Sequence, residues 1–254
     1  MDRAGPGVDW RDAEAYAPLL GADRSILAWE WLRRDPGYRE AFLANLDCLP
    51  GRAPSPPIQW GLHAFEPPDR AVPSARPLWV AAVHPLVLAA VAEPPRSAAD
   101  AFDWRRLAPL VTVAGGRQSG EHVLLSDGLR TIRIDVAGSV REGPVQLRYL
   151  LEGIVAAERP LLTLRRLLAL CRSGRFSAAL HPPDVRAARF ILMLRVQDAL
   201  SEGATQREIA ATLLNAEARA ERWRVSAPTL RTRAQRLVRA ARRMTAGGYK
   251  ALLA

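Results

Sequence analysis

Positively charged side chains, which can bind polyanions, are concentrated in the last fifth of this chain. Residues 203–254 contain ten arginines, one lysine and three glutamates, so this segment carries 11 − 3 = +8 of the formal net charge of +10. The chain has a single lysine, and an arginine-rich composition can reflect coding bias, so the position of the charge is more informative than its total. Arginine bonds phosphates and guanine edges in bidentate fashion. The segment therefore indicates a nucleic-acid partner.

Within that segment, residues 227–244 show helical periodicity with one apolar and one cationic face. The apolar face comprises Leu230, Ala234, Leu237, Val238 and Ala241. The opposite face comprises Thr232, Arg236, Arg239 and Arg243, flanked by Gln235 and Arg242. The second helix of a helix-turn-helix needs this division, because one face packs on the preceding helices and the other enters the major groove. A solvated basic helix on the surface of a bundle is the alternative interpretation.

A shorter amphipathic helix is predicted directly before this one. Thr205 and Glu208 have the spacing of a capping box. The apolar stripe that follows consists of Ile209, Ala210 and Leu213. Together the two predicted helices place a helix-turn-helix at residues 205–244, although the connector 216–225 is longer than the usual turn of this motif.

The geometry of such a motif assigns roles to the polar residues. Base edges are read mainly from the N-terminal half of the second helix, so the predicted base contacts are Thr229, Thr232, Arg233 and Arg236, with Gln235 as a further candidate. The predicted phosphate contacts farther along are Arg239, Arg242 and Arg243. The unpaired N–H groups and dipole of the first helix favour a phosphate at Thr205, Gln206 and Arg207. Arg231 completes the predicted DNA-binding set.

Two regions are expected to position these residues, and together they predict an α+β fold. Region 9–140 should contain helices, a proline-rich connector at 50–77 and a small antiparallel sheet. Region 144–254 should be an all-helical DNA-binding domain that ends in the helix-turn-helix, and its first helix is expected at 144–158. The length of the chain is compatible with two domains.

Local signals predict individual elements of the N-terminal region. Helical spacing is expected over 10–20 and 25–46, with Ser25 as an N-cap and a break at Asp35-Pro36. The apolar stretch 78–92 predicts buried strand structure. A β-hairpin is predicted in which His122–Leu125 pairs with Leu129–Val136 around the turn Asp127-Gly128.

Other chemistries have little support in the sequence. The four histidines (His63, His84, His122 and His181) and the two cysteines (Cys48 and Cys171) are scattered without metal-ligand spacing, so no metal site or cofactor is predicted. The glycines Gly115, Gly116 and Gly120 lack the Lys-Ser/Thr ending of a phosphate loop. No catalytic motif is found, and we expect no enzyme activity. The N-terminus lacks an apolar signal segment, which predicts a cytoplasmic protein without membrane contact.

Six of the seven tryptophans precede the helical C-terminal region. Aromatic side chains are enriched both in cores and at interaction surfaces. Core packing is the commoner role. The alternative is that Trp29 and Trp31 form a protein-interaction surface, used for self-association or for docking of an anti-activator protein.

Several of these segments resemble a known family, the bacterial RovC-like transcriptional regulators and the related FseA-type activators of conjugative-element transfer. Residues 10–20 (WRDAEAYAPLL) and 28–42 (AWEWLRRDPGYREAF) resemble its N-terminal transcriptional-regulator-like domain. The stretch TQREIAATLL, the stretch LRTRAQRLVRAARRM and the closing Gly247-Gly248-Tyr249 with Leu252-Leu253 resemble its RovC-like DNA-binding domain.

The resemblance implies an activator that recognises double-stranded promoter DNA as a homo-oligomer. Its targets would be genes of type VI secretion or of the excision and transfer of a mobile element. Two alternatives remain: a protein-interaction module or anti-activator without promoter specificity of its own, and a nucleic-acid enzyme. Salt-insensitive association with protein alone would favour the first, and magnesium-dependent cleavage the second.

Overall fold

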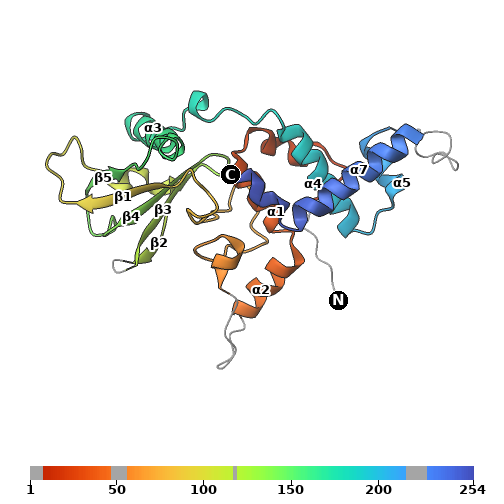
Figure 1. The fold of residues 1–254 in the computed structure, drawn as a ribbon, viewed down its shortest axis with the longest axis horizontal. Helices are drawn as coiled ribbons and strands as arrows, with labels where there is room; N and C mark the ends of the chain where they lie inside the picture. Colours follow the sequence, from red (N-terminus) through yellow and green to blue (C-terminus); the bar gives the residue numbers. More distant parts are fainter. Residues whose placement is uncertain (1–7, 47–55, 117–118, 216–227) are drawn as a thin grey trace.

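The structure of the chain is a computed structural model that describes residues 8–46, 56–116, 119–215 and 228–254. A β-sheet lies at one end of an elongated molecule, and a group of helices lies at the other (Figure 1). The predicted α+β class is confirmed, with N-terminal helices, a sheet and then a helical C-terminal region. Within the described ranges, every helix is too short or too polar to cross a bilayer.

The N-terminal segment forms the 3₁₀ helix η1 (Glu14–Gly21) and the helices α1 (Arg24–Leu32) and α2 (Pro36–Leu46). The predicted break at Asp35-Pro36 is confirmed, and Pro36 takes the first position of α2, where its missing N–H costs nothing. The prediction of Ser25 as an N-cap is wrong. Asp23 precedes α1 in extended conformation, and the Ser25 hydroxyl lies inside α1, where it hydrogen bonds with Thr131 Oγ1 over 2.9 Å.

Five strands form one sheet in the order β2-β3-β4-β1-β5. Their bounds are β1 (Leu88–Glu93), β2 (Val111–Gly116), β3 (Gly120–Ser126), β4 (Thr131–Ala137) and β5 (Gln146–Leu150). The predicted hairpin around Asp127-Gly128 is confirmed as the antiparallel pair β3·β4. We expected an antiparallel sheet, but β1 runs parallel to β4, so the sheet is mixed.

Two predictions of local structure are corrected by the sheet. Residues 144–158 were expected to be helical, but β5 occupies Gln146–Leu150 because it pairs with the edge of β1. In the apolar stretch 78–92, regular strand begins only at Leu88, since Pro85 lies in the turns that precede it. The first difference arises from pairing between distant segments, which local periodicity does not report, and the second arises from a proline within the stretch.

One face of the sheet is covered by α3 (Glu158–Ser173), as Figure 1 shows. Leu167 and Leu170 of this helix pack with the inward side chains of β1, β3 and β4, among them Leu88, Val123 and Ile134. Three short 3₁₀ segments complete this half of the molecule and its connections: η2 (Pro57–Trp60), η3 (Trp104–Leu110) and η4 (Ala178–Leu180).

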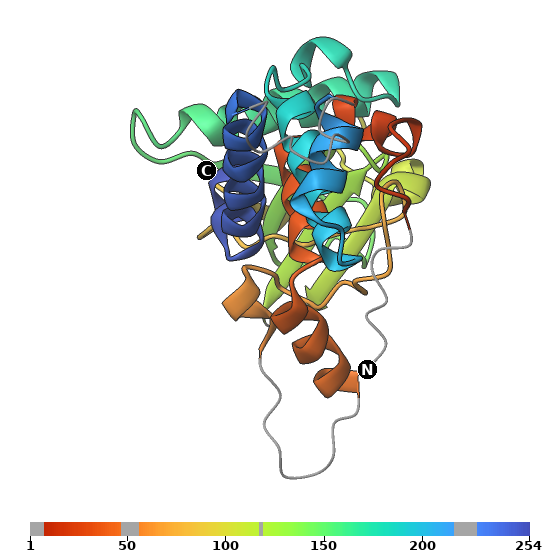
Figure 2. The same cartoon turned by 90° about the vertical axis from the view of Figure 1, so that its right-hand side faces the viewer.

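The C-terminal helices are α4 (Ala187–Ser201), α5 (Gln206–Leu213), α7 (Pro228–Thr245) and the 3₁₀ helix η6 (Gly248–Leu252). They share one hydrophobic core with the N-terminal helices, in which Trp29 and Trp31 of α1 join Leu194 of α4 and Val238 of α7. In Figure 2, which faces the helical end, α5 and α7 lie in front of α1. The predicted domain boundary near residue 140 stays a prediction, but the core combines helices from both sides of it.

A buried charged network joins α1 to α4 within this core. The Arg34 guanidinium donates to both carboxylate oxygens of Asp198, over 2.6 and 2.9 Å, and to Glu30 Oε2 over 2.6 Å. The Tyr16 hydroxyl also donates to Asp198, over 2.6 Å. Burial alone would lower the pKa of Arg34, but the charges of Asp198 and Glu30 raise it, so the guanidinium stays protonated. The network therefore fixes α4, which carries the C-terminal helices, against the N-terminal segment.

Candidate nucleic-acid interface

The apolar face of α7 packs as its periodicity predicts. Ala234, Leu237, Val238 and Ala241 are all buried, and α7 lies against both α4 and α5. At the crossing with α5, the contact is made by Ala210 and Ala234, with Leu214 and Leu230 beside them. Because two alanines face each other here, the two helix axes can approach closely.

The opposite face of α7 is cationic and exposed. The helix contains six arginines and no acidic residue. All six are exposed, namely Arg231, Arg233, Arg236, Arg239, Arg242 and Arg243. Among the residues that the structure describes, none of these six forms an ion pair or a side-chain hydrogen bond. Their guanidinium groups are therefore available to an external anion.

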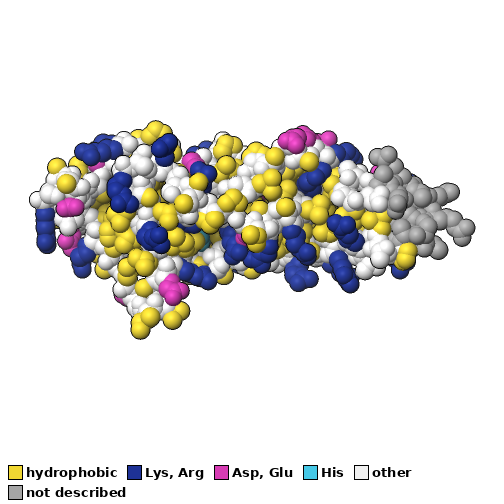
Figure 3. All heavy atoms as spheres, turned by 90° about the horizontal axis from the view of Figure 1, so that it is seen from above, with side chains coloured by type: hydrophobic (Ala, Val, Ile, Leu, Met, Phe, Trp, Pro, Cys, Tyr) yellow, Lys and Arg dark blue, Asp and Glu magenta, His cyan; other side chains and the backbone are white. Residues whose placement is uncertain are grey.

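Seen from above, the helical half of the molecule separates its charges. In Figure 3, Lys and Arg side chains line the lower edge of the right-hand half, and acidic side chains gather at the upper edge. A face with one sign of charge attracts a polyanion and orients it as it approaches. The exposed face of α7 carries the positive charge expected of a DNA-binding surface.

The other polar residues predicted on α7 also lie at the surface. Thr229 and Gln235 are exposed, and Thr232 is half-buried. The Thr232 hydroxyl donates to the Pro228 carbonyl over 3.0 Å. This bond uses the only proton of the hydroxyl, so the Thr232 oxygen can accept a hydrogen bond from a base but cannot donate one unless the bond to Pro228 breaks.

The capping box predicted at the start of α5 is confirmed. The Thr205 hydroxyl accepts from the Glu208 amide over 3.2 Å, and Glu208 Oε2 accepts from the Thr205 amide and hydroxyl, each over 2.7 Å. These hydrogen bonds lower the pKa of Glu208, so its carboxylate is ionised at neutral pH. A phosphate bound at this helix end would meet that carboxylate, so the capping box disfavours the phosphate site predicted at Thr205, while Arg207 remains exposed.

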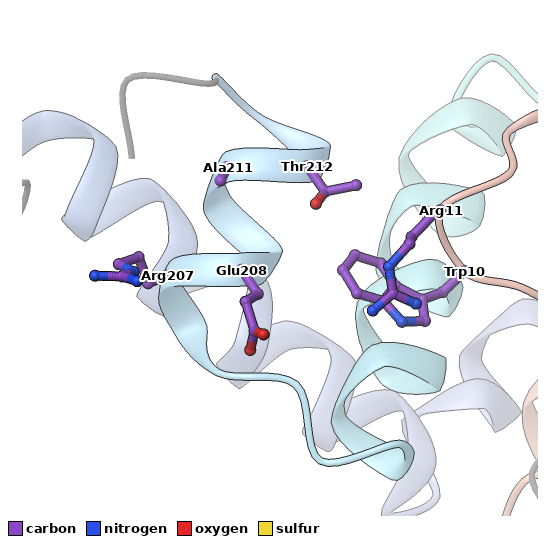
Figure 4. Close-up of a pocket in the computed structure, with 6 residues that line it drawn as sticks. All are labelled: Trp10, Arg11, Arg207, Glu208, Ala211 and Thr212. Carbon is purple, nitrogen blue, oxygen red and sulfur yellow. The ribbon is translucent and has the colours of Figure 1, made fainter. Parts of the chain in front are cut away.

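Figure 4 shows how the two charged residues of this turn diverge. Arg207 extends from one side of α5, while Glu208 and Thr212 lie on the side that faces Trp10 and Arg11. Arg11 stacks on the Trp10 ring and lies 3.5 Å from Glu202 Oε2. Arg11, Arg207 and Glu208 all line this hollow, so its charges partly offset one another, and Arg207 stays exposed at its edge.

Trp29 and Trp31 occupy the core, each with 0% of its surface exposed. The Trp29 indole donates to the Arg70 carbonyl over 3.0 Å and meets the Tyr38 ring edge-on at 5.7 Å between ring centroids. These contacts agree with core packing, the commoner of the two roles considered for the two tryptophans. A partner could not reach either ring in this conformation, which does not fit the use of Trp29 and Trp31 as a docking surface.

Another group of residues with chemical potential was not predicted from the sequence. His63, His122 and Asp135 come from three separate segments and lie close enough to hold one metal ion. Burial, with the adjacent His122 and Arg133, lowers the pKa of His63 to about 4, so its ring is neutral at pH 7. Sequence spacing could not reveal the group, because the three positions meet only through the pairing of β3 with β4 and the fold of the segment after η2.

Comparison with known protein families finds two matches. Residues 9–63 match the proteobacterial transcriptional regulator-like domain, and residues 151–254 match the RovC-type domain described as "T6SS, Transcription factor, DNA binding domain". Both agree with the resemblance that the sequence motifs indicated. The second match contains α5 and α7 in full. A comparison with curated proteins finds no match.

Proposed function

We propose that the chain reads a specific promoter sequence with α7. The premise is that residues 151–254 belong to the DNA-binding domain family of type VI secretion transcription factors, and residues 9–63 to the proteobacterial transcriptional regulator-like domain. The observation that carries this proposal is the row of exposed arginines on α7, for which the described residues supply no ionic partner. A structural basic helix would gain stability from acidic neighbours, whereas a DNA-binding helix needs its cations free.

The position of each side chain along α7 supports a division of roles. The N-terminal half enters the groove, where Thr229, Thr232, Arg233 and Arg236 contact base edges and Gln235 is a further candidate. Arg239, Arg242 and Arg243 follow along the helix and contact phosphates, as does Arg207 of α5. Base contacts set the sequence preference, and phosphate contacts set the affinity and its dependence on salt.

We further propose that the chain acts in the cytoplasm as a homo-oligomeric activator, by binding and not by catalysis. Its targets would be secretion genes or genes for the transfer of a mobile element. Self-association would let two copies of α7 read half-sites about one helical turn apart.

The test compares footprinting on the DNA upstream of the chain's own and neighbouring genes for two variants. The double change Thr232→Ala, Arg236→Ala removes predicted base contacts, and Arg172→Ala removes an exposed arginine at the end of α3, away from this face. We expect the double variant to lose roughly 1–3 kcal/mol for each bidentate contact at the preferred site while weak nonspecific binding persists. The Arg172→Ala variant should footprint like the wild type.

The same experiment separates the second candidate function, a protein-interaction module without promoter specificity. Binding that is steep in salt, shows no preferred site and is equal in the double variant and the wild type would overturn base recognition by α7. Association with a protein partner that is insensitive to salt would then favour the interaction module.

A further inference from the structure

The cluster of His63, His122 and Asp135 combines two strands and a loop. His122 on β3 and Asp135 on β4 are directly opposite each other in the antiparallel register, and His122 Nδ1 lies 2.7 Å from Asp135 Oδ1. His63 follows η2, and its amide bonds the Leu78 carbonyl over 2.8 Å. Its ring stacks on the His122 ring at 3.4 Å between centroids, with 21° between the planes.

Nitrogen and oxygen atoms of the three side chains converge on one place. One ligand atom from each residue lies within 4.8 Å of the others, and His63 Nε2 is 3.9 Å from Asp135 Oδ1. His63 Nε2 is buried yet has no hydrogen-bond partner among the described residues. The three side chains are only 21%, 19% and 28% exposed. An unpaired buried nitrogen that points at a carboxylate leaves a polar group unsatisfied, and a cation between them would satisfy both.

We infer that His63, His122 and Asp135 form a binding site for one divalent transition-metal ion of the zinc class. Two imidazole nitrogens and one carboxylate oxygen suit Zn²⁺ and Co²⁺, and water completes the coordination. The ligand set lacks the thiolates that a copper(I) ion prefers.

Binding requires a small movement, and the structure shows which residue makes it. Ligand atoms around a tetrahedral zinc are about 3.3 Å apart, so His63 Nε2 must approach Asp135 Oδ1 from its present 3.9 Å, and the stacked rings must splay. His122 and Asp135 are held on paired strands, whereas His63 lies outside the sheet, in the segment after η2. The metal would therefore draw His63 toward the sheet and link the end of the regulator-like domain, at residue 63, to β3 and β4.

Arg133 orients the carboxylate through Oδ1, the same oxygen that His122 contacts. Its Nη2 donates to Asp135 Oδ1 over 2.7 Å, and its other nitrogens donate to the carbonyls of Trp79, Val123 and Ile134. A fixed donor behind a ligating carboxylate is the usual arrangement around a protein metal site. The buried positive charge of Arg133 also repels a dication, so we expect micromolar and not nanomolar affinity.

The test uses the purified full chain, dialysed against Zn²⁺ and separately titrated with Co²⁺. We expect one ion per chain, a visible absorption spectrum of Co²⁺ with nitrogen and oxygen ligands, and a higher melting temperature with Zn²⁺. His63→Asn should weaken binding by roughly tenfold or more, and because His63 lies on a loop this variant should fold. His84→Asn, which changes a histidine outside the cluster, should bind metal like the wild type.

Two results would overturn the inference. One is the absence of saturable Zn²⁺ or Co²⁺ binding at micromolar concentrations, which would leave the cluster as a stacked pair of imidazole rings beside a carboxylate. The other is unchanged affinity in His63→Asn, which would place the bound metal elsewhere. Both results are read without DNA, so they are independent of the proposed promoter recognition.

Discussion

The buried ion pair between Arg34 and Asp198 provides the sharpest test of how the helical half is held together. The Asp198 carboxylate is 1% exposed, and it accepts two hydrogen bonds from Arg34 and one from Tyr16. Asp198→Ala removes all three and leaves the Arg34 guanidinium, 3% exposed, with Glu30 as its remaining carboxylate partner. The change therefore leaves one more positive charge than negative charge in the core.

Removing one partner of a buried ion pair costs about 3–5 kcal/mol. Because Glu30 still neutralises part of the charge, and shares its carboxylate with Arg33, we expect the lower half of that range, about 3 kcal/mol. Asp198→Asn keeps the shape and one acceptor oxygen, so it should cost less than Asp198→Ala. A loss of this size is a large fraction of the stability of an ordinary domain.

Equilibrium unfolding in urea measures the effect, and an exposed pair supplies the control. Asp69 is 83% exposed and lies 2.7 Å from Arg39, so Asp69→Ala should cost no more than about 1 kcal/mol. If Asp198→Ala and Asp69→Ala lower the free energy of unfolding equally, the assignment of Asp198 as an anchor of α4 is refuted. A change in the slope of the transition would show instead that the substitution alters the compactness of the denatured or native state, or that unfolding is not two-state.

Three further predictions concern the elements around α7. Thr205→Ala removes the cap of α5 and should cost about 0.5–2 kcal/mol in urea unfolding, while Thr205→Ser keeps the hydroxyl and should be near neutral. Ala234→Leu overfills the crossing of α5 and α7 and should cost about 1–3 kcal/mol and weaken DNA binding, whereas Ala246→Leu at an exposed position should do neither. Burial lowers the pKa of His84 to about 4. A hydrogen bond to Leu253 opposes this shift, and the charge of Arg133 adds to it. Between about pH 6.5 and 4 the unfolded chain binds a proton that the folded chain does not, so stability should fall by up to about 3 kcal/mol as the pH drops, and His84→Gln should reduce this fall.

The parts of the fold that could be predicted from the sequence depend on neighbouring residues. The capping box at Thr205, the hairpin turn at Asp127-Gly128 and the break at Asp35-Pro36 each arise from a few consecutive residues. The amphipathic pattern of α7 likewise specifies its buried and exposed faces over its own length. These signals do not depend on which distant segments pack against them.

The parts that could not be predicted depend on segments that meet only in the folded chain. Gln146–Leu150 becomes a strand because the edge of β1 is available to it. His63 reaches His122 because the segment after η2 lies against the sheet. Trp29 and Trp31 adopt core packing, the commoner of the two roles that the sequence left open, and every residue of α1 from Ser25 to Leu32 is buried with them.

The shared core gives the regulator-like domain a direct physical connection to the candidate DNA-binding face. α1 contacts both α4 and α7, and Arg34, two residues after its end, binds Asp198 on α4. The orientation of α7 is set by the helices under its apolar face, so a shift of α1 would reach α7 through packed side chains. Because close-packed interiors transmit strain between neighbouring side chains, we expect a displacement of α1 to move α4 and α7 together.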